Sequence, residues 1–417
     1  MLPLGYDPKY NRRASRPAPT QGHMFEAMVQ ERIVRLPAWL QTKTKPKKAK
    51  SFDKPAVGRR KGETVSVDVV QDGNRVDIRA DGINLYFAVE GISLPPKADP
   101  TFAIWALLPW AMEEGCDLHI NQPIDPRVAA NAEHLSRIWE MWVPGRYRSV
   151  KVNGGAGWKR AKRERHPLVQ LFSGGVDSTF ALLEQQDSNP HKFAATVCGI
   201  DQIDDDNLSL LISKTEPSLQ RLGYQRLLVR TNVHREPFAY TNGLALAGSA
   251  FLLSDLFEAG CIAADLTRWE EMAVFPWGAN SVTNEYFAGA DFSVKTVGGK
   301  ATRTDKIFAL LEAGFDPNWL SFCRNRKVLP GNCGVCRKCV KTKAMLLLAT
   351  GKFPDIFVDG RFDEALVMES LGNYSDRIQV FDIYFKAMDR GMLDRIPGLA
   401  TVIDTYRLRA PKRAGSA

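Results

Sequence analysis

Hydrophobic and polar residues alternate with a period of two in the first strongly patterned part of the chain. From Glu63 the segments ETVSVDVV, RVDIRA and INLYFAVE place β-branched or aromatic residues at alternating positions, with Asp-Gly pairs between them. This alternation is typical of half-buried strands, and Asp-Gly pairs favour tight turns between antiparallel strands. Apolar residues at helical spacing follow from Thr101 and from Val128. The pattern predicts an accessory α+β domain over residues 24–150, built from a β meander and helices.

The pattern changes after Gly154–Gly157, where short apolar runs begin to alternate with amphipathic segments. LVQLF, KFAATVCGI and QRLLVR resemble buried strands, whereas TFALLEQQ and NLSLLISKTEPSLQRLG have the helical period. Further helix and strand signals lie at Gly243–Glu258 and Cys261–Ala264. Strands that alternate with helices are typical of a parallel sheet with right-handed crossovers. The sequence predicts an α/β domain over residues 167–320, with about five strands.

The remaining segments differ in composition. Residues 1–23 are rich in Pro, Arg and Gly and are expected to form a flexible N-terminus. Residues 151–166, which include the run KRAKRER, are expected to form a basic linker. Residues 321–417 contain clustered cysteines and helical signals, and we expect a metal-binding and helical region there.

The net charge of +9 is unevenly distributed, with basic runs at Thr42–Gly62 and Lys159–Arg165. Such runs can bind nucleic acid or another polyanion, but specific single-strand sites also supply aromatic platforms, which are few here. A solvated linker face is the favoured interpretation, and nucleic acid stays open as a partner. Apolar stretches are too short or too interrupted to span a bilayer, and the N-terminus lacks the apolar core of a signal peptide. We therefore expect a cytoplasmic protein without a membrane partner.

The string SGGVDS at Ser173–Ser178 lies where an apolar strand is followed by a helix. Glycines let an anion approach the backbone, and the first amides of a helix have no intrahelical partner, so this junction favours phosphate binding. Ser173 and Ser178 add hydroxyl donors, whereas Asp177 either caps the helix or holds a Mg²⁺ ion that bridges the phosphates. A glycine turn with a capping residue is the alternative, but the full string with its flanking strand and helix favours a nucleotide site.

SGGVDS resembles the loop of the PP-loop ATP pyrophosphatases, and the GK[ST] ending of a Walker loop is missing. The resemblance implies an adenine nucleotide alpha hydrolase-like fold that splits ATP between the α and β phosphates and adenylates a carbonyl or carboxyl oxygen. It implies catalytic roles for Asp177 and Ser178, and backbone contacts to adenine near Gly199. The residues expected to bind ATP are Ser173, Gly174, Gly175, Val176, Asp177, Ser178, Thr179 and Gly199.

Four of the seven cysteines are clustered with the spacing C-x9-C-x2-C-x2-C: Cys323, Cys333, Cys336 and Cys339. Thiolates at this density repel one another unless a cation neutralises them, and Zn²⁺ binds four of them tetrahedrally. An iron–sulfur cluster is the alternative occupant. A closed four-thiolate zinc site has no open position for water, so we expect a structural role.

The loop and the cysteine spacing together resemble 7-cyano-7-deazaguanine synthase over roughly 167–348. In that family ATP adenylates the carboxylate of 7-carboxy-7-deazaguanine, and ammonia then attacks. The acceptor side departs from the family: GIDQIDDDN and TNVHREPFAYTNG replace its motifs, and only Arg303 or Lys306 stands near the position of its lysine. The long segment ahead of the loop is more similar to relatives in bacterial anti-phage operons, which are thought to join a deazaguanine to the N-terminal amine of a partner protein.

We therefore expect ATP-dependent activation of a deazaguanine acid and its transfer to an amine, with ATP, Mg²⁺ and Zn²⁺ as cofactors and an operon-encoded protein as acceptor. Trp269, Phe275 and Trp277 follow a predicted strand end and are candidates to stack on a flat ring, with core packing as the alternative. Arg303 and Lys306 are the other substrate candidates. Nearby Asp265, Glu270 and Glu271 either meet the edge of the ligand or form surface ion pairs.

Three other functions stay open at this point. The chain could release the nitrile after reaction with ammonia, or modify tRNA as other PP-loop enzymes do, with its basic segments gripping RNA. A binding protein gated by ATP is the non-enzymatic alternative. Formation of AMP separates the enzymes from the binding protein.

Overall fold

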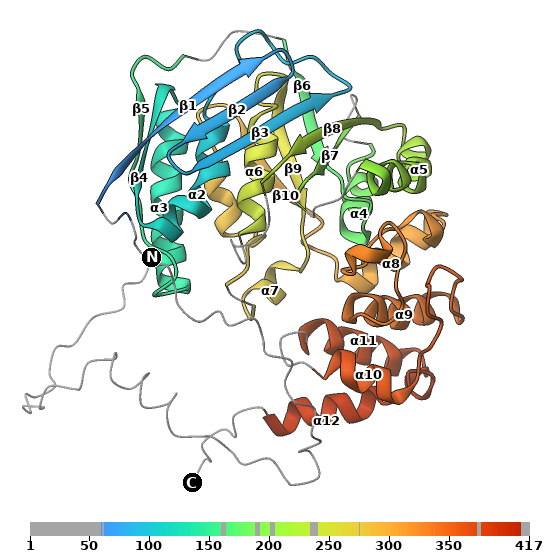
Figure 1. Ribbon diagram of the computed structural model, residues 1–417. Coiled ribbons are helices and arrows are strands. Elements are labelled where there is room, and N and C mark those ends of the chain that lie inside the picture. Colours follow the sequence, from blue (N-terminus) through green and yellow to red (C-terminus); the bar gives the residue numbers. More distant parts are fainter. Residues whose placement is uncertain are drawn as a thin grey trace, which may run out of the picture. The chain divides into compact units, whose positions relative to one another are not determined.

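The fold is built on one sheet of ten strands with the order β10-β9-β6-β7-β8-β3-β2-β1-β4-β5 (Figure 1). The computed structural model describes residues 60, 62–159, 164–187, 192–200, 205–233, 241–274, 276–372 and 377–409. The strands are β1 (Thr64–Asp72), β2 (Arg75–Ala80), β3 (Ile83–Glu90), β4 (Asp117–Pro123), β5 (Val152–Gly155), β6 (His166–Leu171), β7 (Phe193–Cys198), β8 (Gln225–Thr231), β9 (Phe257–Ala263) and β10 (Ser293–Val297).

Most neighbouring strands run parallel. The five strands β10, β9, β6, β7 and β8 form a continuous parallel arrangement, and β1, β4 and β5 are also parallel to one another. Among the strand pairs of the described residues, β1 with β2, β2 with β3, and β3 with β8 are antiparallel. The chain is therefore an α/β protein with a large, mostly parallel sheet, as the alternation of strand and helix signals predicts.

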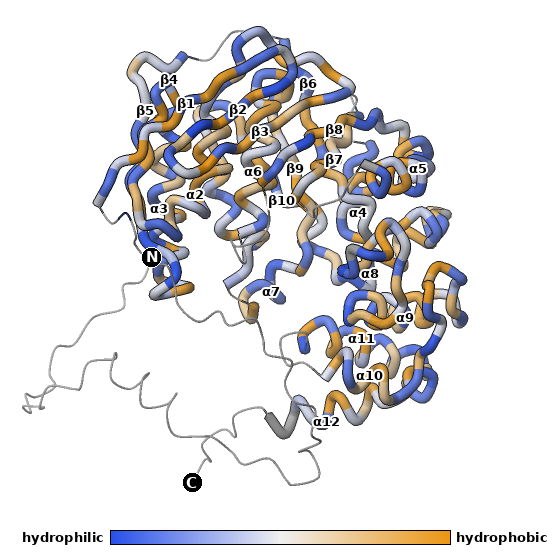
Figure 2. Tube along the Cα trace, viewed as in Figure 1, coloured by the Kyte–Doolittle hydropathy of each residue, from blue (hydrophilic) through white to orange (hydrophobic). Residues whose placement is uncertain are grey.

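The β meander matches its sequence pattern closely. Along β1 every second residue from Val65 to Val69 is turned toward the interior, and the alternation of hydrophobic and hydrophilic positions is visible in β1–β3 (Figure 2). The meander continues the parallel strands instead of forming a sheet of its own, because β3 pairs with β8 from Phe87 opposite Thr231 to Glu90 opposite Leu228. The sheet is therefore continuous across residue 150, where the sequence analysis ends the accessory domain.

The described helices of eight or more residues pack around this sheet and beyond its end. They are α2 (Phe102–Glu114), α3 (Pro126–Trp142), α4 (Val176–Glu184), α5 (Asp205–Leu222), α6 (Asn242–Phe251), α8 (Arg303–Glu312), α9 (Arg337–Thr350), α10 (Glu364–Leu371), α11 (Arg377–Asp389) and α12 (Leu399–Arg409). The short helix α7 covers Arg268–Glu271. Helices α2 and α6 share one hydrophobic core, in which Trp105 contacts the rings of Phe251 and Phe287.

One predicted helix is too long at its end. The apolar run at Gly243–Glu258 predicts a single helix, but α6 ends at Phe251 and the strand β9 already begins at Phe257. Short apolar runs do not distinguish a buried helix from a buried strand, and here turns at Leu253 and Ser254 separate the two elements. The C-terminal helices α9–α12 gather around a second core, which also includes the cysteines.

Candidate functional site

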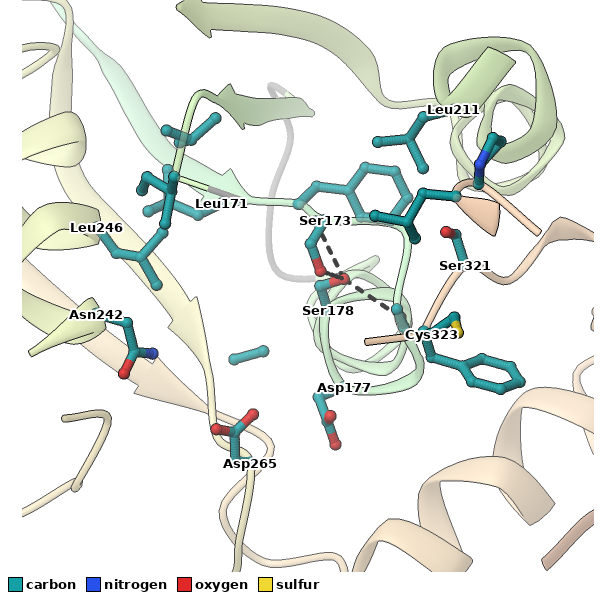
Figure 3. Close-up of a pocket in the computed structure, with 18 of the residues that line it drawn as sticks. Leu171, Ser173, Asp177, Ser178, Leu211, Asn242, Leu246, Asp265, Ser321 and Cys323 are labelled. Atoms are coloured by element: carbon teal, nitrogen blue, oxygen red, sulfur yellow. Dashed lines mark hydrogen bonds between the residues drawn. The ribbon is translucent and has the colours of Figure 1, made fainter. Parts of the chain in front are cut away.

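A cavity of about 450 Å³ opens at the carboxyl ends of β6, β7 and β9 (Figure 3). This edge is where open α/β sheets bind ligands, and the volume is in the range of small-molecule sites. Polar lining residues are Ser173, Asp177, Ser178, Asn207, Asn242, Asp265, Arg303, Ser321, Arg324 and Lys338. The predicted loop, the start of α8 and the cysteine segment therefore meet at one cavity.

The segment Ser173–Ser178 forms a tight turn between β6 and α4. Gly174 has φ +74°, and a Cβ atom there would lie 2.4 Å from Cγ2 of Thr215, so the position requires glycine. Gly175 is the N-cap residue of α4. The Ser178 hydroxyl accepts a hydrogen bond from the Ser173 amide over 3.2 Å and donates to the Gly175 carbonyl over 3.2 Å. These bonds hold the loop in shape at the positive end of α4.

Asp177 pairs with two cations from α8. Its carboxylate accepts hydrogen bonds from Arg303 and, over 3.3 Å, from the Lys306 ammonium. Lys306 is fully buried and also donates to the Ala264 carbonyl over 2.5 Å. Burial by itself would raise the pKa of Asp177, but the charges of Arg303 and Lys306 outweigh it and hold the pKa below its ordinary value. Asp177 does not cap α4.

The start of α8, which supplies both cations, is fixed by its own capping box. The Thr302 hydroxyl accepts from the Asp305 amide, and the Asp305 carboxylate accepts from the Thr302 amide and hydroxyl. Asp305 also forms an ion pair with Lys386 of α11. Arg303 and Lys306, which the sequence analysis gives as substrate candidates, both contact Asp177 of the loop, but only Arg303 lines the cavity.

Only some of the residues expected to bind ATP line the cavity. Ser173, Gly175, Asp177 and Ser178 line the cavity, whereas Val176 and Thr179 are buried beneath the loop. Gly199 has φ +107°, and a Cβ atom there would lie 1.6 Å from the Thr231 carbonyl oxygen, so this glycine packs against β8. Its neighbour Ile200 lines the cavity.

The four cysteines bring their sulfur atoms within 4.8 Å of one another. The Sγ atoms of Cys323 and Cys336 are 3.9 Å apart, and so are the Sγ atoms of Cys333 and Cys339. Two thiolates on one tetrahedral zinc ion with Zn–S bonds of ~2.3 Å are expected about 3.8 Å apart. The hydrogen bond with Cys336 raises the pKa of the Cys323 thiol to about 11. Four thiolates this close would repel one another, so a cation between them would favour the ionised form.

Backbone geometry around the cysteines also suits a metal. The amides of Asn325 and Cys333 donate to the Cys323 sulfur over 3.3 and 3.4 Å, as amides do toward thiolate ligands. Gly334 has φ +83°, and a Cβ atom there would lie 2.0 Å from the Asp359 carbonyl oxygen. The predicted set Cys323, Cys333, Cys336 and Cys339 is therefore a four-cysteine cluster that could hold a metal such as Zn²⁺.

The cysteine segment contacts the loop directly. The Ser321 amide donates to the Gly174 carbonyl over 2.8 Å. The next residue, Phe322, donates its amide over 3.1 Å to the side chain of Asn332, which is fully buried and itself donates to the Leu320 carbonyl. The position of the loop is thereby tied to the cysteine segment.

The two tryptophans predicted to stack on the ligand, Trp269 and Trp277, do not line the cavity. Trp269 lies on α7 with 60% of its surface exposed. Trp277 is partly buried, and neither tryptophan is among the lining residues. Phe275 lies outside the described residues. The aromatic stacking role consequently stays a prediction without support from the cavity lining.

Among the three acidic residues of this segment, only Asp265 lines the cavity, as Asp177 also does (Figure 3). No hydrogen bond or ion pair to Asp265 is found in the described part of the chain. Glu270 completes the capping box of α7 with Thr267. Glu271 is buried, and its carboxylate accepts from the Ser281 amide over 2.9 Å. Glu270 and Glu271 are therefore buried and hydrogen-bonded within their own segment, and they form no surface ion pair with any residue that the structure describes.

Several lining residues were missed by sequence reasoning. Asn242 begins α6, and Asn207 lies on α5, but single asparagines give no signal in a sequence. Arg324 and Lys338 are each adjacent to a cysteine, but a basic residue beside a cysteine does not by itself indicate a cavity. Lys343 is a further cation near the cysteines: its ammonium lies close to Gly334 and donates to the Asp359 and Arg361 carbonyls over 2.6 and 2.7 Å.

The two basic runs lie largely outside the described residues. Of the first run, Arg60 is described, and it pairs with Asp81 over 2.6 Å. Of the second run, Arg165 donates to the Phe257 carbonyl over 3.1 Å.

None of the described helices combines the length and apolar character needed to cross a membrane. Comparisons with protein-family models, with curated proteins and with solved structures found no match.

Proposed function

We propose that the chain activates a carboxylic acid with ATP, with release of pyrophosphate, and transfers the acyl group to an amine. The observation that carries this proposal is the convergence of the Ser173–Ser178 turn, the N-terminus of α4 and Arg303 on one cavity at the carboxyl edge of the sheet. Glycine backbone, helix amides and a cation together suit a polyphosphate.

The residues divide the reaction between them. A carboxylate oxygen of the acid attacks the α phosphorus, and the bond to the β phosphate breaks as pyrophosphate leaves. The turn and Arg303 stabilise the charge that develops on pyrophosphate. The amine then attacks the acyl carbon, and AMP leaves with the former carboxylate oxygen. Asp177 holds Arg303 in place, so we assign it a positioning role beside catalysis.

In this proposal Asp265, and not Asp177, is the carboxylate that would bind Mg²⁺. Asp177 already balances Arg303 and Lys306, whereas Asp265 lines the cavity with a carboxylate that no described residue engages. Mg²⁺ prefers carboxylate and phosphate oxygens and is usually bound by one or two carboxylates together with the nucleotide. Zn²⁺ in the four-cysteine cluster would take no part in bond making.

The resemblance to 7-cyano-7-deazaguanine synthase supports 7-carboxy-7-deazaguanine as the acid, and the long N-terminal part supports a protein amine, in anti-phage defence, as the acceptor. Exchange of labelled pyrophosphate into ATP tests the first step, because it requires reversible adenylation. We expect exchange that depends on the deazaguanine acid and on Mg²⁺, and a hydroxamate when hydroxylamine replaces the amine. ATP cleavage to ADP, or no exchange with this acid, would contradict the proposal.

A further inference from the structure

The four-cysteine segment supplies two cations to the wall of the cavity. Arg324 directly follows Cys323, and Lys338 lies between Cys336 and Cys339. Both side chains line the cavity together with Arg303 of α8 and with Ser173 and Asp177, which belong to the distant loop between β6 and α4. The metal cluster and the loop therefore border the same space.

Lys338 stands at an unfavourable place for helix stability. It lies in the first turn of α9, with Cys336 as the N-cap residue and no acidic residue in that turn. The N-terminus of a helix repels cations, so a lysine there is not explained by the stability of α9. Lys338 and Asp177 line the same cavity, and the charge of Lys338 helps to lower the pKa of the Asp177 carboxyl.

The charge of the cavity wall favours an anion. Arg303, Arg324 and Lys338 are the cations, and Asp177 and Asp265 are the carboxylates. Asp177 is balanced by Arg303 and by the buried Lys306 behind it. Two cations on the cysteine side thus line the same cavity as the loop, which lies at the N-terminus of α4, where the helix dipole also attracts negative charge.

The position of these two cations depends on the cysteines. Arg324 and Lys338 are each one residue away from a metal-ligating position, and Ser321, three positions before Arg324, donates its amide to the Gly174 carbonyl over 2.8 Å. A metal that draws the four sulfurs together fixes the backbone at both cations. Without it, the loop side keeps Arg303, but the cysteine side loses its fixed geometry.

We propose that Arg324 and Lys338 bind the phosphates of the nucleotide, so that metal binding at the four cysteines and nucleotide binding in the cavity strengthen each other. This inference rests on the proposed function, because it takes the anion to be ATP. Coupling between two sites is reciprocal: a metal that strengthens nucleotide binding is itself held more tightly when the nucleotide is bound. The cluster then regulates substrate binding in addition to supporting the fold.

The experiment compares full-length wild type with Arg324→Gln, Lys338→Gln and the double variant. The probe is α,β-methylene ATP with Mg²⁺, which cannot be split at the α–β bond, and its Kd is measured by calorimetry after zinc content has been determined. We expect the affinity to fall about ten-fold for each cation removed, at unchanged zinc content. Lys327→Gln is the matched control, because Lys327 is exposed in the same segment and does not line the cavity.

The second measurement is the rate at which zinc passes to a chromogenic chelator. The analogue is expected to slow this transfer at least five-fold in wild type and to have little effect in the double variant. Equal Kd values for wild type and double variant, or zinc transfer that ignores the analogue, would overturn the inference and leave the proposed function standing. Wild type that binds neither the analogue nor pyrophosphate would overturn both.

Discussion

The Lys306 ammonium is fully buried and lies 3.3 Å from the Asp177 carboxylate, which also pairs with Arg303. The helix α8 is thereby joined to the first turn of α4, next to the proposed phosphate site. A buried ion pair costs desolvation when it forms, but removal of one partner leaves the other charge buried and unbalanced. Asp177 is for this reason as important for the fold around the loop as for chemistry.

Asp177→Ala is expected to abolish pyrophosphate exchange and to destabilise the protein by about 3–5 kcal/mol, because two buried cations lose their partner. A purely catalytic loss is what the sequence alone favours. Urea unfolding of the single variants, of Lys306→Met and of the double variant separates the two effects. The double variant should recover part of the stability but none of the activity, and a simple sum of the single losses would contradict the pairing.

The same pair predicts the pH dependence of the loop. The pKa of Asp177 lies below its ordinary 3.8, so the ionised carboxylate contributes stability above that pH and loses the contribution as the pH falls through the lowered value. The stability difference between wild type and Asp177→Asn should consequently be constant near neutral pH and shrink in acid. Denaturant unfolding from pH 7 down to pH 3 measures it, and a difference that grows in acid would refute the assignment.

Local patterns predicted the parts of the site that depend on neighbouring residues. SGGVDS and the cysteine spacing each occupy one short segment, and the strand before the loop and the helix after it follow from periodicity. Contacts between distant segments left no such signal. The hydrogen bond from Ser321 to Gly174 and the pairing of β3 with β8 join residues more than 130 positions apart, so they depend on how the completed elements pack.

Gly174→Ala is expected to damage the loop more than a positive φ angle alone explains. Gly174 and Gly157 have φ angles of +74° and +84°, but a Cβ atom meets Thr215 at 2.4 Å in the first case and nothing within 4 Å in the second. We expect Gly157→Ala to cost about 1–2 kcal/mol from backbone strain. Gly174→Ala should cost more and should also weaken binding of α,β-methylene ATP. Equal effects of the two substitutions would show that Thr215 does not crowd the turn.

Trp105→Ala tests whether the accessory strands and the parallel strands fold as one unit. Trp105 is fully buried on α2 and contacts Phe251 and Phe287, which follow the basic linker in the sequence. The loss of its side chain should cost about 3–5 kcal/mol. Because β3 pairs with β8, we expect one cooperative thermal transition that moves as a whole to lower temperature. A second transition left at the wild-type temperature would show that residues after the linker fold independently.

Glu271 should respond to pH in the opposite sense from Asp177. Burial raises its pKa above the ordinary 4.5, and one of its carboxylate oxygens, Oε1, is buried without a partner among the described residues. The stabilising contribution of the protonated form is complete below 4.5 and is lost as the pH rises through the raised value. Glu271→Gln should therefore gain stability relative to wild type between pH 5 and pH 8. Unfolding at both pH values measures this, and a relative loss at pH 8 would contradict it.

Removal of one cysteine tests the metal cluster itself. Cys336→Ser leaves three thiols, so the metal should be held far more weakly and the stability of the C-terminal core should fall, because that core includes the cysteines. Purified wild type is expected to carry one zinc ion per chain and no visible absorbance, which excludes an iron–sulfur cluster. Cys116→Ala is the control: Cys116 is fully buried outside the cluster, and its loss should change stability modestly and zinc content not at all. Wild-type zinc content and thermal stability in Cys336→Ser would show that the four sulfurs do not share a metal, and the proposed coupling to the cavity would fall with it.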